Sequence, residues 1–272
     1  MKNKKLKKII IILVIILTFI CFCYYENNHI KLTKYEYKTS KLHKGNKYKI
    51  IQLSDFHNKK IRNNNEKLIR LIKDEKPDII VITGDYIDSN HTRTDISLNL
   101  TKQLTKIAPV YFITGNHECS IDIEKLFEFE NQLKKLGVNV LYNESVRLDN
   151  GINLIGLDDL CLNDGTLSKI MDDLSKNDLN ILLAHEPQYI SDYAKTGVDV
   201  VLSGHTHGGQ IRIPFTRIGI VAPNQGMFPK YTAGEYVEDD TTMFISSGIG
   251  NSILPLRIFN CPEIVELQIV SE

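Results

Sequence analysis

The hydrophobic pattern divides the chain into an apolar N-terminal run, a polar segment and a long regular region. Residues 9–25 form an uninterrupted run without charge, which is close to the shortest run that spans a bilayer and slightly longer than a signal-peptide core. The run ends on Cys23-Tyr24-Tyr25, whereas a signal peptide cleavage site is marked by small residues. We therefore expect an uncleaved transmembrane anchor, with a cleaved signal peptide as the alternative.

The region after the anchor has the pattern of an α/β protein. Residues 26–47 are polar and rich in lysine and asparagine, so we expect a linker there, followed by one domain over residues 48–272. Apolar runs predict strands at residues 48–53, 79–83, 110–114, 181–184, 200–203, 211–213, 242–246 and 264–269, and helical spacing predicts helices at 66–75, 95–107 and 121–136. Asn150-Gly151 between two β-rich runs predicts a hairpin. The expected architecture is a β core covered by helices on both faces.

The charge distribution bears on topology and on partners. Five lysines precede the apolar run, at positions 2, 4, 5, 7 and 8. Lysines on this flank predict that residues 1–8 are cytoplasmic and that the domain lies on the other side of the membrane. The formal net charge of the chain is zero, so outside these lysines acidic residues outnumber basic ones. We therefore expect no nucleic-acid partner, because the body lacks a basic surface excess.

Metal-binding residue types follow five of the predicted strands. In chain order they are Asp55 and His57, Asp85, Asn116 with His117, His185, and His205 with His207. Loops beyond the carboxyl ends of strands meet at one edge of an α/β fold, so these side chains are expected to converge. Alternate residues of an extended chain point the same way, which suits Asp-x-His and His-x-His pairs to one cluster. Five of the eight histidines fall in these strand-end motifs, and we interpret the set as a metal site.

The ordered motifs resemble those of the calcineurin-like metallophosphoesterase superfamily. The motifs are Asp55-Phe56-His57, Gly84-Asp85, Gly115-Asn116-His117-Glu118, His185 and Gly204-His205-Thr206-His207. The stretch GHTHGGQ, followed later by Ser247-Gly248-Ile249-Gly250 and Pro255-Leu256-Arg257, is similar to the bacterial membrane-associated or secreted phosphohydrolase branch. The resemblance covers residues 48–270 and implies a four-layer α-β-β-α sandwich of two mixed β-sheets flanked by helices.

The resemblance also implies two metal ions that share one carboxylate. It assigns Asp55, His57, Asp85 and His207 to one ion, and Asp85, Asn116, His185 and His205 to the other, with Asp85 and a hydroxide as bridges. Mixed carboxylate, imidazole and amide ligands suit Mn, Fe or Zn better than Mg or Ca. Two such ions activate the bridging water for in-line attack on phosphorus. The expected reaction is hydrolysis of a phosphomonoester or a phosphodiester.

Residues around the expected centre receive roles by the same resemblance. His117 is expected to meet the leaving group, by donating a proton or by stabilising the alkoxide, with metal ligation as the alternative. Asp88 is expected to orient His117, as in the matching stretch of relatives. Glu118 is expected to be structural, as a cap of the following helix. Arg212 and Arg257 are expected to pair with acids rather than to contact phosphate.

Substrate and oligomeric state are not readable from the sequence. The anchor suggests a lipid or cell-envelope phosphoester. A catalytically silent scaffold of the same fold is the main alternative, disfavoured because every expected ligand and His117 are present. A redox-active di-iron pair is a third, less favoured hypothesis.

Overall fold

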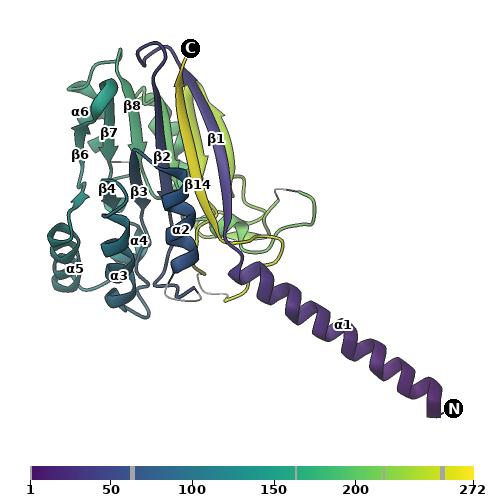
Figure 1. Ribbon diagram of the computed structural model, residues 1–272. Helices are drawn as coiled ribbons and strands as arrows, with labels where there is room; N and C mark the ends of the chain where they lie inside the picture. Colours follow the sequence, from purple (N-terminus) through teal and green to yellow (C-terminus); the bar gives the residue numbers. More distant parts are fainter. Residues whose placement is uncertain (1, 62–64, 163, 217, 252–254) are drawn as a thin grey trace.

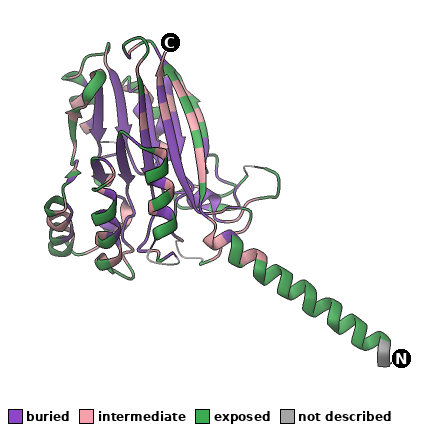
Figure 2. Ribbon diagram, in the orientation of Figure 1, coloured by how far each residue is buried: buried purple, intermediate pink, exposed green. Residues whose placement is uncertain are grey.

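The protein consists of a long N-terminal helix that projects from a layered body (Figure 1). The structure, a computed structural model, describes residues 2–61, 65–162, 164–216, 218–251 and 255–272. Helix α1 (Lys2–Asn28) includes the predicted 9–25 run and the residues on both sides of it. Its side chains are exposed over most of its length (Figure 2). By length and composition α1 is able to cross a membrane.

The first sheet is mixed and has the strand order β1-β14-β2-β3-β4-β5. Its strands are β1 (Lys31–Thr39), β2 (Lys47–Leu53), β3 (Ile79–Thr83), β4 (Val110–Ile113), β5 (Val138–Val140) and β14 (Glu263–Ser271). Strand β14 runs antiparallel to β2, and every other pair of neighbouring strands in this sheet is parallel. The carboxyl ends of β2, β3 and β4 therefore lie at the same edge of the sheet.

The second sheet is also mixed, with the order β12-β13-β9-β8-β7-β6. Its strands are β6 (Glu144–Arg147), β7 (Ile152–Gly156), β8 (Leu179–Leu183), β9 (Val200–Ser203), β12 (Gly234–Glu238) and β13 (Thr241–Ile245). Strands β7, β8, β9 and β13 are parallel, and an antiparallel strand borders them on each side. The antiparallel pair β6 and β7 confirms the hairpin predicted at Asn150-Gly151.

Helices cover the outer faces of both sheets. They are α2 (Glu66–Glu75), α3 (Thr94–Leu104) and α5 (Ile123–Lys135) on the first sheet, and α6 (Thr166–Asp172) and α7 (Ile190–Lys195) on the second. Short elements at the strand ends are α4 (Asn116–Cys119), the 3-10 turns η2 (Asp159–Cys161), η3 (Pro187–Tyr189) and η4 (His207–Gly209), and the small pair β10 (Val221–Ala222) and β11 (Gly226–Met227). The helices predicted from spacing are confirmed, with end points shifted by a few residues for α3 and α5.

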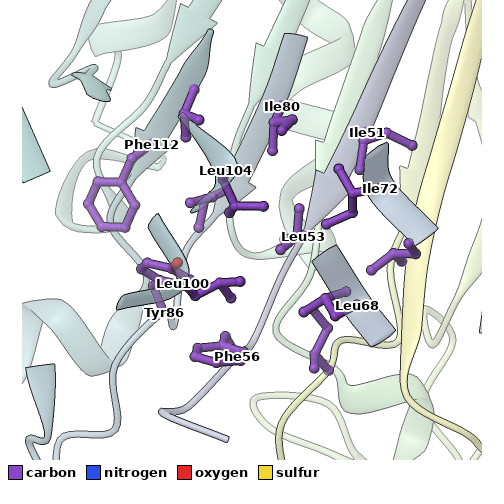
Figure 3. Packing of buried hydrophobic residues seen from close by; sticks show 14 of the residues in the cluster. Ile51, Leu53, Phe56, Leu68, Ile72, Ile80, Tyr86, Leu100, Leu104 and Phe112 are labelled. Carbon is purple, nitrogen blue, oxygen red and sulfur yellow. The ribbon is translucent and has the colours of Figure 1, made fainter. Parts of the chain in front are cut away.

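Three apolar clusters lie at the three interfaces of this four-layer sandwich. Strand β3 illustrates why, because successive side chains of a strand point to opposite faces. Ile80 and Ile82 pack against α2 and α3, next to residues such as Leu68 and Leu100 (Figure 3). Val81, on the other face of the same strand, packs in the cluster between the two sheets. The continuous apolar runs of the central strands thus reflect burial on both faces.

Two predictions about the chain's organisation are wrong. The predicted linker at 26–47 contains β1, which pairs in parallel with β14 from Lys31–Glu263 to Thr39–Ser271. The last turn of α1 also contacts the body, since Glu26 accepts a hydrogen bond from the Asn260 amide. The strand predicted at 211–213 is absent from the described residues, where this stretch forms only isolated bridges.

Candidate metal centre

The predicted ligands converge at the edge where the strands of both sheets end. Asp55 and His57 follow β2, Asp85 follows β3 and His207 follows β9, and one ligand atom of each lies within 4.8 Å of those of the others. All four residues are buried. His207 Nε2 lies 3.5 Å from Asp55 Oδ1, and His57 Nε2 lies 3.5 Å from Asp85 Oδ2. Side chains separated by about 150 positions in the sequence thus face one small space.

A second group of ligand-type side chains shares Asp85 with the first. It comprises Asp85, His185 and His205, again with ligand atoms within 4.8 Å of one another. His185 follows β8, and its Nε2 lies 3.2 Å from Asp85 Oδ2. Asn116 follows β4, and its Oδ1 is buried without a hydrogen-bond partner in the described structure. The two groups of ligand-type side chains thus have the Asp85 carboxylate in common.

The donor set fits divalent ions on the evidence of its own unpaired atoms. Asn116 Oδ1 and His205 Nδ1 are both buried and both lack a hydrogen-bond partner among the described residues. Buried polar atoms of native proteins are almost always paired, so each such atom needs an explanation. An ion at the second group accounts for both, because a carboxamide oxygen and a neutral imidazole nitrogen are suitable ligands.

Hydrogen bonds from the surrounding backbone fix the ligand side chains. Both Asp55 oxygens lie at 3.0 and 3.1 Å from the His205 amide nitrogen, which donates to them. The His117 amide donates to Asp85 Oδ1 at 2.8 Å. His185 Nδ1 lies 2.7 Å from the Thr83 carbonyl oxygen, and donation to it leaves Nε2 unprotonated in the neutral ring and directed at Asp85. Partners of this kind orient metal ligands in proteins.

The backbone at the ligands is held in the left-handed region. Asp55, His57, Asp85, His205 and His207 have φ of 50°, 47°, 50°, 69° and 48°. A positive φ is uncommon for residues other than glycine, and strained positions of this kind cluster at functional sites. The neighbouring Gly115 is also dictated by the ligands, because a Cβ there would lie 2.5 Å from Asp85 Oδ1.

Burial and mutual charge shift the pKa values of these ligands. Burial lowers the pKa of His57 to about 4 and that of His205 to about 3. Burial also raises the pKa of Asp55 to about 6. Burial acts on Asp85 and His185 as well, but their opposite charges prevail, so the pKa of Asp85 is well below and that of His185 well above its usual value. His57 and His205 are therefore neutral imidazoles at pH 7, the form that binds metal ions.

His117 lies at the rim of the centre, and Ser89 rather than Asp88 holds its ring. The Ser89 amide donates to His117 Nδ1 at 3.1 Å, and Ser89 Oγ lies at the same distance. Asp88 Oδ1 is 3.6 Å from that nitrogen, within ion-pair range but without a hydrogen bond. His117 Nε2 faces inward, 3.9 Å from Asp85 Oδ2. With Nδ1 as an acceptor, the neutral ring carries its proton on Nε2 and presents it to the centre.

Glu118 has a larger structural part than the helix cap that the sequence predicted. Its carboxylate accepts from the Gly115 amide at 2.9 Å, which caps its own short helix α4. It also accepts from the Asp85 amide at 2.8 Å and the Ile87 amide at 2.9 Å. Burial, with a contribution from Asp85, raises the pKa of Glu118 to about 8 against the opposing effect of the Ile87 and Gly115 amides. One buried side chain thus joins the loops that carry Asp85 and Asn116.

The prediction that Arg257 pairs with an acid is wrong. Its side chain is fully buried, and its guanidinium donates to the carbonyl oxygens of Ser247 and Gly250. No acidic side chain lies within ion-pair distance of it in the described part of the chain. Its Nη2 lies 3.4 Å from His207 Nδ1, so Arg257 packs behind a predicted ligand. The other arginine, Arg212, donates its Nε to the Gly208 carbonyl at 2.8 Å.

Two residues next to the centre were not predicted. Asn224, in the turn between β10 and β11, has its Nδ2 3.3 Å from His205 Nε2 and donates to both Glu186 oxygens at 3.1 Å. Glu186 Oε1 in turn lies 3.9 Å from His205 Nε2. The only local signal was that Glu186 directly follows the ligand-type His185, and nothing in the sequence near Asn224 indicates this contact.

Comparisons with known proteins identify a family, relatives of similar sequence and a solved structure of similar fold. The family model described as calcineurin-like phosphoesterase matches residues 48–209. The Bacillus subtilis (strain 168) metallophosphoesterase YkoQ is 30% identical over 263 residues, which cover 93% of this chain and 97% of that protein. The Bos taurus transmembrane protein with metallophosphoesterase domain is 31% identical over 244 residues, 82% of this chain and 53% of that protein. The solved structure of TT1561 from Thermus thermophilus is similar in fold, with a TM-score of 0.52 at 10% identity over 75% of this chain and 91% of that one.

Proposed function

Since the chain belongs to the calcineurin-like phosphoesterase family, and is thus a hydrolase of phosphoesters, we propose that it is a dinuclear-metal-dependent phosphohydrolase that cleaves a phosphomonoester or a phosphodiester. The observation that carries this proposal is the pair of ligand groups that share Asp85. A shared buried carboxylate is what a two-ion site needs, because it holds both ions in fixed relation to one substrate.

We assign the ions to the two groups. Asp55, His57, Asp85 and His207 would hold one ion, and Asp85, Asn116, His185 and His205 the other. The mixed nitrogen and oxygen donors favour Mn, Fe or Zn. When bound, two such ions supply an activated water for in-line attack and stabilise the negative charge of the transition state. The two carboxylates do not neutralise two divalent ions, so the site retains a positive charge that attracts a phosphate.

His117 is the residue assigned to the leaving group. Its Nε2 faces Asp85 across 3.9 Å, and its Nδ1 accepts from the Ser89 amide. An N–H on Nε2 can donate a hydrogen bond to the leaving oxygen as negative charge develops there, which lowers the barrier most for poor leaving groups. Ser89 keeps the ring in this orientation, and Asp88 places a carboxylate beside it.

Helix α1 supports a membrane location for this activity. Its apolar side chains are exposed, with Ile9 to Leu17 each about half exposed or more, and the five lysines lie at its N-terminal end. We propose that α1 crosses the membrane once, that residues 1–8 are cytoplasmic and that the catalytic domain is extracytoplasmic. The substrate would then be a lipid or another phosphoester of the cell envelope.

The test is hydrolysis of nitrophenyl phosphate and bis-nitrophenyl phosphate by the purified full-length chain in detergent, loaded with Mn, Fe or Zn. Activity on at least one ester that is lost in Asp85→Ala supports the proposal. His43→Ala is the matched control, because His43 is exposed and follows no strand end of the centre. Inactivity of the loaded wild type on both esters and on phospholipid vesicles would contradict it.

A further inference from the structure

Large apolar side chains are exposed on the loops beside the metal centre. Phe215 is fully exposed, and Met227, Phe228, Ile218 and Phe259 are exposed to 68%, 59%, 49% and 46%. We call these five residues the apolar rim. Exposed apolar groups of this size that lie together mark a surface that something covers.

Backbone contacts hold the rim together and join it to α1. The Ile213 amide bonds to the Ile218 carbonyl oxygen, and the Phe228 amide to the Ile220 carbonyl oxygen. The Arg212 amide donates to the carbonyl oxygen of Ile258, the residue before Phe259. Phe259 then packs on Phe22 of α1, with ring centroids 5.0 Å apart. These contacts thus connect α1, through Phe259 and Ile258, to the described residues of the loop at 211–228.

The contact with Phe22 indicates how deep the rim lies relative to the membrane that α1 crosses. Phe22 lies within the apolar run 9–25, on the N-terminal side of Tyr24 and Tyr25. Tyrosines at the end of an apolar helix sit at the membrane interface, so Phe22, two residues earlier, lies about 3 Å deeper at the rise of an α-helix. Phe259 is thus at the depth of the outermost apolar layer. Figure 1 shows the loop at 211–228 at the same end of the body, beside the C-terminal end of α1.

The same loop reaches the metal centre. Strands β10 and β11 enclose the turn that carries Asn224, whose side chain contacts His205 and Glu186. Met227 and Phe228 follow this turn directly. One short hairpin therefore has a polar tip at the ligands and apolar side chains on its exposed flank.

We propose that the apolar rim docks into the interfacial layer of the bilayer that α1 crosses, so that the metal centre works at the membrane surface. A phosphoester at that position can keep its apolar part in the bilayer while its phosphate reaches the ions, and the substrate class is thus a phospholipid. The docking rests on the rim and α1, whereas the substrate class rests on the proposed function as well.

Tryptophan fluorescence tests the docking directly, because the sequence contains no tryptophan. Phe215→Trp and Phe228→Trp each create a single reporter in the full-length chain, which is reconstituted into phosphatidylcholine vesicles with plain or brominated acyl chains. Brominated lipid is expected to reduce the emission of both reporters roughly twofold or more, as for side chains inserted at the headgroup boundary. Equal emission in the two kinds of vesicle would overturn the docking.

Phe127→Trp is the matched control. Phe127 is 63% exposed and lies on α5, a helix on the side of the body opposite α1 (Figure 1). Its emission is expected to be the same in both kinds of vesicle. If the rim reporters become shielded from an aqueous quencher without quenching by brominated lipid, a second copy or another protein covers the rim, and the proposal is wrong.

Activity separates this inference from the proposed function. The double variant Phe215→Ser, Phe228→Ser is expected to hydrolyse phosphatidic acid or phosphatidylglycerol in vesicles severalfold more slowly than the wild type. Its rate on the soluble nitrophenyl ester is expected to stay unchanged, because neither residue contacts the centre. Quenching without activity on any ester would refute the proposed function and leave the docking intact. Activity on the soluble ester without quenching of the rim reporters would refute the docking. Activity on the soluble ester without cleavage of either lipid would refute the lipid substrate.

Discussion

The metal centre and the apolar rim are opposite departures from the usual distribution of polarity. The centre buries Asp55 and Asp85, although aspartate is a mostly exposed residue type, and the rim exposes Phe215 and Phe228, although phenylalanine is a mostly buried one. A buried polar group and an exposed apolar patch are the informative exceptions in a folded protein. We propose a partner for each, metal ions in the first case and a bilayer in the second.

The two regions also differ in how firmly the chain holds them. The centre lies at strand ends, where backbone amides donate hydrogen bonds to Asp55 and Asp85. The backbone of both residues also has a positive φ. The rim lies on loops with few paired strands, joined by single backbone contacts. We infer that substitutions in the centre change chemistry and stability together, whereas those in the rim change only where the chemistry takes place.

The largest effect is expected from Asp85→Asn. The amide removes the negative charge that both ligand groups share, so the chain should lose about 10³-fold or more in kcat, equivalent to about 4 kcal/mol of transition-state stabilisation. The kcat for the soluble ester measures this loss, and mass spectrometry measures the metal content of the variant. Retention of activity within about tenfold of the wild type, with both ions bound, would show that the two groups do not form one centre.

His117→Asn should follow, with a loss of about 10²- to 10⁴-fold in kcat. The reason is the loss of the N–H that faces the leaving group, so the loss should be greater for alkyl phosphates than for nitrophenyl phosphate. Metal content is the control and should stay at the wild-type value. A uniform loss on all leaving groups, accompanied by loss of an ion, would instead make His117 a ligand.

Removal of the ions should destabilise the protein in a pH-dependent way. At a free ion concentration of about 100 times Kd, bound ions contribute about 2.7 kcal/mol, which corresponds to a melting temperature higher by about 5–10 °C. Asp55, whose pKa is raised to about 6, stabilises the ion-free fold when protonated, and this contribution is lost as pH rises through about 6. His185, whose pKa is raised, must also lose its proton to bind an ion.

The ion-dependent shift in melting temperature should therefore grow from about pH 5 to about pH 7. His57 and His205 do not limit binding in this window, because their pKa values of about 4 and about 3 leave them neutral. Thermal scans with and without chelator at several pH values measure the shift. A shift that is the same at both ends of the window would contradict the protonation state assigned to Asp55.

The smallest effect is expected for the rim. Met227→Ser in the full-length chain should change the free energy of unfolding by less than about 0.5 kcal/mol, because an exposed side chain on the short strand β11 loses little packing. Denaturant titration in detergent measures it, with Phe129→Ser, a buried substitution on α5, as the destabilised reference. Destabilisation of similar size in the two variants would mean that Met227 is packed against the body rather than exposed.

The sequence predicted the centre better than its surroundings, and the reason is physical. Predicted ligands such as Asp85 and His185 follow short buried strands, and both the apolar run and the polar residue after it are visible in the local sequence. Strand β1 was missed because it is an edge strand whose polar residues outnumber its apolar ones. The alternation of Thr33, Tyr35 and Tyr37 with charged residues was a usable signal, but pairing with β14 is not local.

The residues that position the ligands were the least predictable. Glu118 bonds to the Asp85 amide 33 positions away, and Asn224 contacts Glu186 from 38 positions away. Arg257 was expected to pair with an acid, but its guanidinium donates to backbone carbonyl oxygens and to Asn251 Oδ1. Such contacts depend on which loops the fold brings together, and no pattern within a window of the sequence records them.

The most direct test of the central claim is the electron paramagnetic resonance spectrum of the full-length chain loaded with Mn. Two ions per chain that share Asp85 are expected to give an exchange-coupled spectrum, which changes to that of isolated Mn in Asp85→Asn. A fully loaded wild type that shows only isolated Mn, whether from one ion or from two independent ones, would contradict the shared-carboxylate centre.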